Sequence, residues 1–271
     1  MTNESNPCDY LEPVCDIARA AGSRILDIYE RGFTVEAKAD KSPLTEADRA
    51  AHELIVARLP KLAGDIPVLS EESAAAEYET RAGWKRFWLV DPLDGTKEFI
   101  NRNGEFTVNI ALIDNGRPVL GVVYVPVLAQ TYFACIGQGA FKQKGQDAAK
   151  PIQVRRYGGS RPIVVASRSH AGKETEAMLQ SLGEHDVVSM GSSLKFCLVA
   201  EGTADIYPRL GPTMEWDTAA AQCVVEAAGG RVTDPDRQPL SYNKRSLLNP
   251  WFLVSGAGDY DWYRHLPATA K

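Results

Sequence analysis

Residues Phe87 to Phe99 read FWLVDPLDGTKEF, and the interpretation of the whole chain starts from this stretch. The apolar run Phe87–Val90 predicts a buried strand. Pro92 has no backbone N–H donor, so we expect the chain to leave its sheet there. Gly95 permits a backbone angle that a side chain would hinder. The stretch therefore predicts a buried strand that is followed directly by a turn with functional residues.

Two carboxylates, Asp91 and Asp94, stand three positions apart on this turn. With the backbone carbonyl of Leu93 between them, they form a cluster made only of oxygen atoms. Such a cluster suits a hard cation, Mg²⁺ or Mn²⁺, better than zinc. The alternative is an Asx-turn, in which both carboxylates only accept hydrogen bonds from nearby backbone amides.

Two further acidic segments favour the metal site over the turn. The acid pair Glu71-Glu72 follows the expected strand end Val68-Leu69-Ser70. Asp217 lies near the start of an alanine-rich helix that ends at Gly229-Gly230. A carboxylate there is also favoured by the helix dipole alone. Because the other acids are present, we interpret Asp217 as a ligand and Glu72 as a neighbour of the ligands.

These three motifs, in this order, resemble the magnesium-dependent, lithium-sensitive phosphomonoesterases of the inositol monophosphatase superfamily. The pattern is an acid pair after a strand, then DPxDGT, then WDxxA before a Gly-Gly pair. Inositol monophosphatases themselves usually continue DGT with an Asn-Phe pair. Here the sequence continues Lys97-Glu98-Phe99, and residues 191–200 read GSSLKFCLVA. These segments resemble the 3'(2'),5'-bisphosphate nucleotidases, in particular a bacterial branch of sulfate assimilation.

The resemblance implies a complete metal-binding and catalytic set. It implies two or three Mg²⁺ ions, with Mn²⁺ as a substitute, and five ligands: Glu71, Asp91, the Leu93 carbonyl, Asp94 and Asp217. It also implies that Thr96 orients the attacking water while a carboxylate takes the proton. The catalytic residues would be Thr96, Asp48 and Glu71. Asp48 has a second interpretation, because Thr45 and Asp48 fit a helix capping box.

A bisphosphorylated nucleotide needs a second anion site. Ser167–His170 and Gly191–Lys195 each follow an expected strand, and a helix N-terminus accommodates phosphate. The alternative interpretation makes Ser192 a helix cap and Lys195 a solvated side chain. Arg209 is a further candidate. The resemblance implies these substrate-binding residues: Gly95, Thr96, Ser167, His170, Gly191, Lys195 and Asp217.

Composition limits the class of protein. The chain has 271 residues, 44% hydrophobic and 24% charged, which is ordinary for a globular protein. The net charge of −5 argues against a nucleic-acid polymer as partner. We expect no signal peptide, because the N-terminal residues lack a basic region and an apolar core. We expect no transmembrane segment, because the most apolar stretch, 119–136, is broken by Pro126 and Gln130. The five dispersed cysteines are expected to be reduced intracellular thiols.

Periodicity predicts two different halves. Residues 1–155 combine helices over Leu11–Arg31 and Thr45–Leu59 with a meander of strands, which indicates an α+β half with an antiparallel sheet. Residues 156–271 alternate strand and helix, which indicates an α/β half. The boundary is expected within Lys142–Arg161. The resemblance implies a layered αβαβα sandwich of the sugar and inositol phosphatase type, with the site between the halves.

The sequence is therefore interpreted as a Mg²⁺-dependent phosphatase that converts adenosine 3',5'-bisphosphate to AMP and phosphate. The resemblance adds action on the 3'-phosphorylated sulfonucleotide, inhibition by Li⁺, and a cytoplasmic location, with peripheral association with the inner membrane in some relatives. Two alternatives are an inositol or sugar phosphatase and a non-catalytic nucleotide- or metal-binding protein. No pattern bears on the oligomeric state.

Overall fold

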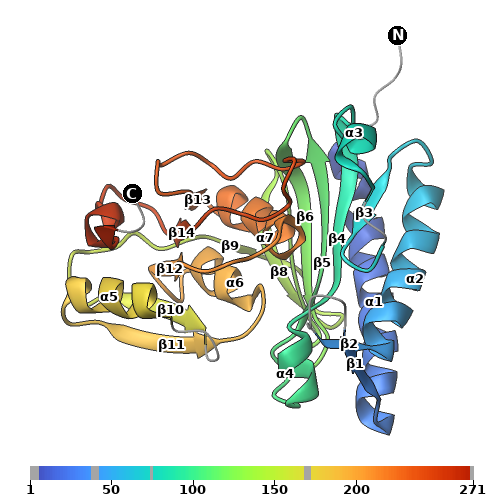
Figure 1. Ribbon diagram of the computed structural model, residues 1–271, viewed down its shortest axis with the longest axis horizontal. Helices are drawn as coiled ribbons and strands as arrows, with labels where there is room; N and C mark the ends of the chain where they lie inside the picture. The colour runs from blue at the N-terminus through green and yellow to red at the C-terminus, as the bar shows by residue number, and fades with distance from the viewer. Residues whose placement is uncertain (1–5, 38–42, 74–75, 168–171, 269–271) are drawn as a thin grey trace.

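Five layers of helix and sheet make up the protein. The structure is a computed structural model that describes residues 6–37, 43–73, 76–167 and 172–268. Figure 1 shows α1 and α2 outside a large sheet, α6 and α7 on its other face, then a second sheet with α5 beyond it. The expected αβαβα sandwich is confirmed.

The outer layer consists of two amphipathic helices. α1 (Leu11–Arg31) places apolar residues at intervals of three and four, and these are buried against the large sheet. α2 (Glu46–Leu62) begins with a capping box, in which the Thr45 N–H donates to Asp48 Oδ2 at 2.8 Å. Both helices therefore follow the prediction from the sequence, and α2 carries Asp48 on its buried side.

The large sheet has the strand order β3-β4-β5-β6-β7-β8-β9. Only the β3–β4 pair is parallel, and each later strand returns antiparallel to the one before it. Asn115 and Gly116, both at positive φ, close the hairpin between β5 and β6. The strands are β3 (Val68–Ser70), β4 (Arg86–Asp94), β5 (Thr107–Asp114), β6 (Arg117–Val125), β7 (Gln130–Cys135), β8 (Gly139–Lys144) and β9 (Lys150–Ile152).

The expectation that the strand ends at Pro92 is wrong, because β4 continues to Asp94. Pairing with β5 holds at Asp91↔Asn109 and resumes at Asp94↔Thr107, so β4 carries one extra residue between these pairs. This is a β-bulge, and the missing N–H of Pro92 costs little within it. The bulge allows both acidic residues to belong to one strand while the chain bends towards the site.

The smaller sheet lies in the second half, with the order β11-β10-β12-β14-β13. β10, β11 and β12 are parallel, as the strand–helix alternation predicts, but β14 pairs antiparallel with β12 and β13. Its strands are β10 (Ile163–Ser167), β11 (Asp186–Met190), β12 (Ile206–Arg209), β13 (Arg231–Thr233) and β14 (Phe252–Ser255). Its helices are α5 (Lys173–Leu182), α6 (Leu194–Ala200) and α7 (Glu215–Ala227).

Helix α7 contacts both sheets. It follows β12 in sequence but packs on β5 and β6 of the large sheet. Gly121 on β6 makes this approach feasible, because a Cβ there would lie 2.2 Å from the Ala220 carbonyl oxygen. One apolar core therefore includes residues of both halves. β9 also falls inside the segment expected as the boundary, and the division into 1–155 and 156–271 stays a prediction.

Short elements complete the described chain. No helix within the described ranges has the length and apolar character needed to cross a membrane. The short elements are η1 (Pro7–Tyr10), β1 (Val35–Ala37), β2 (Pro43–Thr45), α3 (Tyr78–Arg81), α4 (Thr96–Ile100) and η2 (Trp262–His265).

The expectation of five reduced cysteines is wrong for two of them. Cys8 in η1 and Cys135 at the end of β7 form a disulfide across 127 residues of sequence. Cys15, Cys197 and Cys223 are free and buried. Sequence spacing could not reveal this pair, because its two members meet only after α1 has packed on the sheet.

Candidate active site

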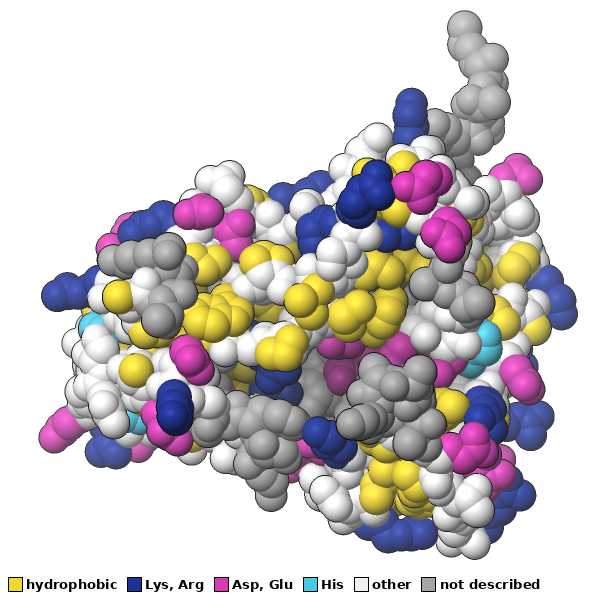
Figure 2. Space-filling view, viewed as in Figure 1, with side chains coloured by type: hydrophobic (Ala, Val, Ile, Leu, Met, Phe, Trp, Pro, Cys, Tyr) yellow, Lys and Arg dark blue, Asp and Glu magenta, His cyan; other side chains and the backbone are white. Residues whose placement is uncertain are grey.

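Acidic side chains from three elements meet beside the bulge of β4. Glu71 follows β3, Asp91 lies in β4, and Asp217 lies in the first turn of α7. Each offers a carboxylate oxygen, and these three oxygens all lie within 4.8 Å of one another. Figure 2 shows acidic side chains within a hollow on this face of the molecule, with basic side chains beside it. The fold thus concentrates negative charge where the end of β3, the strand β4 and the start of α7 meet.

Leu93, Asp94 and Thr96 line the same cavity of about 340 Å³ as these three acids. The Asx-turn expected as an alternative is present, because Asp91 Oδ1 accepts the Leu93 N–H at 3.0 Å. That hydrogen bond does not remove Asp91 from the acidic cluster. The turn and the cluster are therefore two properties of one side chain.

The cluster has the properties of a cation site. Burial, followed by repulsion from Glu71 and Asp94, raises the pKa of Asp91 well above its usual value. Burial and the Asp94 carboxylate likewise raise the pKa of Asp217. A divalent cation would offset both effects, and an all-oxygen donor set fits Mg²⁺ or Mn²⁺. Glu71, Asp91, Leu93, Asp94 and Asp217 are the residues that could hold it.

Thr96 and Asp48 meet at the edge of this cavity. The Thr96 hydroxyl lies 3.2 Å from Asp48 Oδ1, and it is the donor because a carboxylate only accepts. Asp48 Oδ2 accepts from the Thr45 N–H at 2.8 Å and the Thr45 hydroxyl at 2.5 Å. One carboxylate therefore caps α2 and holds the Thr96 hydroxyl, so the two interpretations of Asp48 are compatible.

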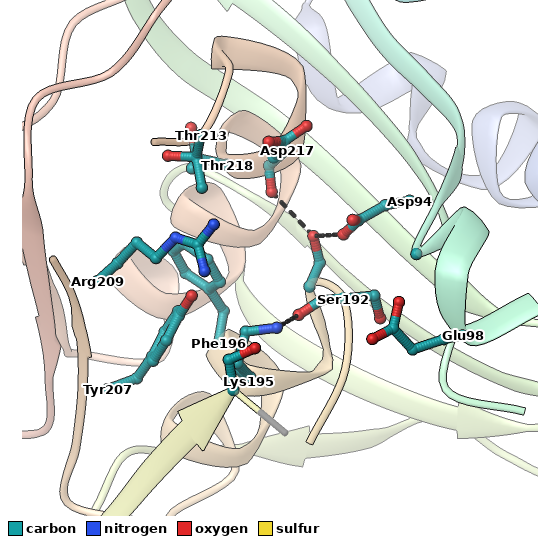
Figure 3. Close-up of a pocket in the computed structure, with 13 residues that line it drawn as sticks. Asp94, Glu98, Ser192, Lys195, Phe196, Tyr207, Arg209, Thr213, Asp217 and Thr218 are labelled. Carbon is teal, nitrogen blue, oxygen red and sulfur yellow. Dashed lines mark hydrogen bonds between the residues drawn. The ribbon is translucent and has the colours of Figure 1, made fainter. Parts of the chain in front are cut away.

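A second, smaller cavity of about 130 Å³ adjoins the first (Figure 3). Lys195 lines it and is buried, in contrast to the solvated side chain considered as an alternative. Its ammonium donates to the Ser192 carbonyl at 2.6 Å and lies 5.6 Å from the centre of the Tyr207 ring. Burial lowers the pKa of Lys195 to about 8, against the attraction of nearby carboxylates such as Asp94.

Three polar atoms of this second cavity are buried without a hydrogen-bond partner in the described part of the chain. They are Ser192 Oγ, Arg209 Nε and Thr213 Oγ1. Buried polar groups are normally satisfied, so three orphans around one cavity point to a polar ligand. Arg209 was a candidate from the sequence, whereas Thr213 had no sequence signal. Ser192 lies in the expected anion-binding segment Gly191–Lys195, with a helix cap as its alternative interpretation. The helix cap position is Ser193 instead.

The remaining expected contacts differ in their placement. Ser167 lines the second cavity. The Gly191 N–H already donates to Glu105 Oε2 at 2.8 Å, so a phosphate would have to displace that carboxylate. His170 lies outside the described residues. Gly95, at φ 95°, lines both cavities beside the bulge.

Two supporting residues escaped the sequence interpretation because their partners are distant in sequence. Ser193 Oγ lies 2.7 Å from Asp94 Oδ2 and 2.9 Å from the Asp217 carbonyl oxygen, and so links β4 to α7. Glu215 is fully buried and pairs with Lys244 at 2.7 Å. It also accepts the Asn243 N–H at 2.7 Å, which fixes the start of α7 two residues before Asp217.

Comparison with known proteins agrees with this geometry. Residues 9–255 match the inositol monophosphatase family, and the chain belongs to that family. Among individual relatives, the chain is 56% identical to the 3'(2'),5'-bisphosphate nucleotidase CysQ of Shigella flexneri, over 90% of this chain and 99% of that protein. It is 55% identical, over the same shares, to the protein of that name from Escherichia coli strain K12.

Solved structures show the same architecture. The crystal structure of CysQ from Bacteroides thetaiotaomicron superposes with a TM-score of 0.79 at 48% identity, covering 90% of this chain and 96% of that one. The inositol monophosphatase of Anabaena (Nostoc) sp. PCC 7120 superposes with a TM-score of 0.77 at 25% identity, covering 98% and 100%. The fold is thus shared across the family.

Proposed function

We propose that this protein is a Mg²⁺-dependent 3'(2'),5'-bisphosphate nucleotidase, which hydrolyses the 3'-phosphate of adenosine 3',5'-bisphosphate to give AMP and phosphate. One observation carries the proposal. The acidic cavity and the cavity that holds Lys195 share four lining residues: Asp94, Gly95, Glu98 and Asp217. A site for a metal-bound phosphate therefore adjoins a site with a buried cation. This pair of sites suits a substrate with two anionic groups.

The names of the relatives support the same substrate. The similarity to the nucleotidases named above extends over almost their full length. The sulfonucleotide that carries a 3'-phosphate has the same two anionic ends and is a second expected substrate. We also infer a cytoplasmic location and sensitivity to Li⁺ from the family resemblance. These are properties of the proposed enzyme and are tested separately from its substrate.

In the proposed mechanism, Glu71, Asp91, Leu93, Asp94 and Asp217 hold Mg²⁺. The bound metal would polarise the phosphate and acidify water. Thr96 then has a simple task. Its proton is engaged by Asp48 at 3.2 Å, so its free lone pairs can accept a hydrogen bond from the attacking water. Asp48 can receive the water's proton through this hydroxyl, as a general base.

At the other end of the substrate, Lys195 and Arg209 supply positive charge. Ser192 Oγ and Thr213 Oγ1, which lack partners in the described structure, can bond to phosphate oxygens. Charge-assisted contacts of this kind orient the substrate, so that the scissile phosphate lies over the acidic cluster. His170, as a further contact, remains part of the proposal.

The decisive experiment measures phosphate release from adenosine 3',5'-bisphosphate, AMP, inositol 1-phosphate and fructose 1,6-bisphosphate, with and without Mg²⁺. We expect the nucleoside bisphosphate to have the highest kcat/KM, and chelation to abolish turnover. A higher kcat/KM for inositol 1-phosphate would replace the proposal with inositol phosphatase activity. Nucleotide binding without turnover would indicate a binding protein instead.

A further inference from the structure

We propose that Glu98 is a specificity-determining residue that accepts a hydrogen bond from the free ribose hydroxyl beside the scissile phosphate. This inference rests on the proposed function and names the part of the substrate that one side chain recognises. Glu98 lies in α4, two residues after Thr96, and it lines both cavities. It therefore stands where the acidic cavity and the cavity of Lys195 meet.

Close packing fixes the direction of this side chain. A Cβ on Gly191 would lie 2.6 Å from Glu98 Cγ, so the stem of Glu98 rests directly on the backbone of Gly191. A Cβ on Gly95 would lie 3.4 Å from Glu98 Oε2, which places the carboxylate close to the DPLDGT turn. Figure 3 shows the carboxylate of Glu98 directed into the cavity towards Ser192. The absence of a side chain at Gly191 thus leaves room for Glu98.

The charge of the carboxylate attracts the buried ammonium of Lys195, but no described residue bonds to it directly. It forms no hydrogen bond and no ion pair within the described ranges, whereas the neighbouring acid Glu105 bonds to the Gly191 N–H at 2.8 Å. Glu98 also lies outside the group of three acids that can share one cation. A half-buried acid that is held in place without a hydrogen-bond partner in the described part of the chain is suited to binding a ligand.

The chemistry of a carboxylate limits what it can meet. When ionised it only accepts hydrogen bonds, and it repels phosphate, so the substrate must present a neutral donor there. In a nucleoside 3',5'-bisphosphate the ribose lies between the two anionic groups, and the 2'-hydroxyl adjoins the 3'-phosphate. In the 2',5' isomer the 3'-hydroxyl takes that position. Acidic side chains recognise ribose hydroxyls in the same way in dinucleotide-binding proteins.

The test compares two substrates that differ only in this hydroxyl: adenosine 3',5'-bisphosphate and its 2'-deoxy analogue. kcat/KM is measured for wild type, Glu98→Met and Glu98→Gln at fixed Mg²⁺ and ionic strength. Wild type should prefer the ribonucleotide by roughly ten- to a hundredfold, the usual range for a hydrogen bond to a charged group. Glu98→Met removes the acceptor but keeps the length of the side chain, and should reduce the preference to within about threefold.

Glu98→Gln keeps an uncharged acceptor, so its preference for the ribonucleotide should lie between that of wild type and that of Glu98→Met. A merely structural role of Glu98 would not produce this order. Equal losses on both substrates in Glu98→Met would overturn the inference and leave the nucleotidase proposal standing. A wild type without preference between the two substrates would do the same. If wild type hydrolyses neither nucleotide but releases phosphate from inositol 1-phosphate, the proposed function itself is wrong, and this inference with it.

Discussion

Thr96 contributes to the site through one hydroxyl whose proton is already engaged by Asp48. Thr96→Ala should lower kcat strongly and leave KM within a few-fold, because the hydroxyl acts on the attacking water and not on the bound substrate. General acid–base contributions of this type are typically about 10²–10⁴-fold. Thr96→Ser keeps the hydroxyl and serves as the matched control. A change in KM alone would make Thr96 a substrate ligand.

Protonation of Lys195 should make the activity depend on pH. Its pKa is lowered to about 8 in the free protein, so kcat/KM for adenosine 3',5'-bisphosphate should decline as the pH rises from 7 to 9. The decline follows from loss of the positive charge. A substrate without the second phosphate should show no matching decline.

Lys195→Met, which keeps the buried stem of the side chain, is the control. It should lose roughly ten- to a hundredfold on the bisphosphate and little on the monophosphate. It should also lack the alkaline decline that the ammonium causes. Equal losses on both substrates would make Lys195 a structural residue.

At the scale of elements, the strength of the local signal decided what could be predicted. α1 and the capping box of α2 follow from patterns within a few residues, and both are present. β9 and β14, with three and four residues, are too short for periodicity to identify. The continuation of β4 past Pro92 depends on a bulge against β5, and local sequence does not determine such pairing.

The residues of the site also divide into those that local sequence could predict and those that it could not. The acids could be found because they lie in motifs that sequence displays, such as DPLDGT. Ser193, Glu105 and Arg209 could not be assigned their contacts, because these join segments far apart in the chain. The burial of Lys195 and the Cys8–Cys135 disulfide likewise arise only when distant elements pack.

Gly121 provides a test of how α7 is seated. An added Cβ there would overlap the Ala220 carbonyl oxygen and lie 2.8 Å from Cys223 Cβ, so Gly121→Ala must push α7 away from β6. Overpacking of a core usually costs about 1–3 kcal/mol of unfolding free energy. Because α7 carries Asp217, the apparent affinity for Mg²⁺ should fall as well. Denaturant unfolding and Mg²⁺ titration of activity measure the two effects.

Gly116→Ala is the control for that experiment. Gly116 belongs to the same sheet, but it lies in the β5–β6 turn, where its backbone has φ 76°. Its replacement should lower stability through backbone strain without affecting Mg²⁺. If Gly121→Ala lowers neither stability nor Mg²⁺ affinity, α7 does not lie as close to β6 as described.

For the whole molecule, the acidic cluster couples stability to pH and metal. In the metal-free protein the pKa values of Asp91 and Asp217 are raised above 3.8, chiefly by burial. The folded state therefore retains protons that the unfolded state releases as the pH rises above about 4. Stability from these groups is present in full below that pH and is lost as the pH rises towards the folded pKa values.

Mg²⁺ should reverse this loss, because it binds the folded protein and replaces the protons. Mg²⁺ at a hundred times its Kd for the folded protein raises the free energy of unfolding by about 2.7 kcal/mol. This should raise Tm by roughly 5–10 °C for a chain of this size. The increase should be larger at pH 8 than at pH 5.5, where protons compete with the metal. Thermal unfolding with Mg²⁺ or chelator at both pH values measures it.

Asp217→Asn is the informative variant, because an amide oxygen can still accept the Met214 N–H that Asp217 Oδ2 accepts at 2.8 Å. Without the buried charge, the metal-free variant should be at least as stable as wild type at pH 8. Its Tm should respond little to Mg²⁺, and its phosphatase activity should nearly vanish. An Mg²⁺-induced increase in Tm that is equal at both pH values, or undiminished in Asp217→Asn, would mean that the metal binds elsewhere. In that case the acidic cluster would need another explanation for its burial between the two sheets.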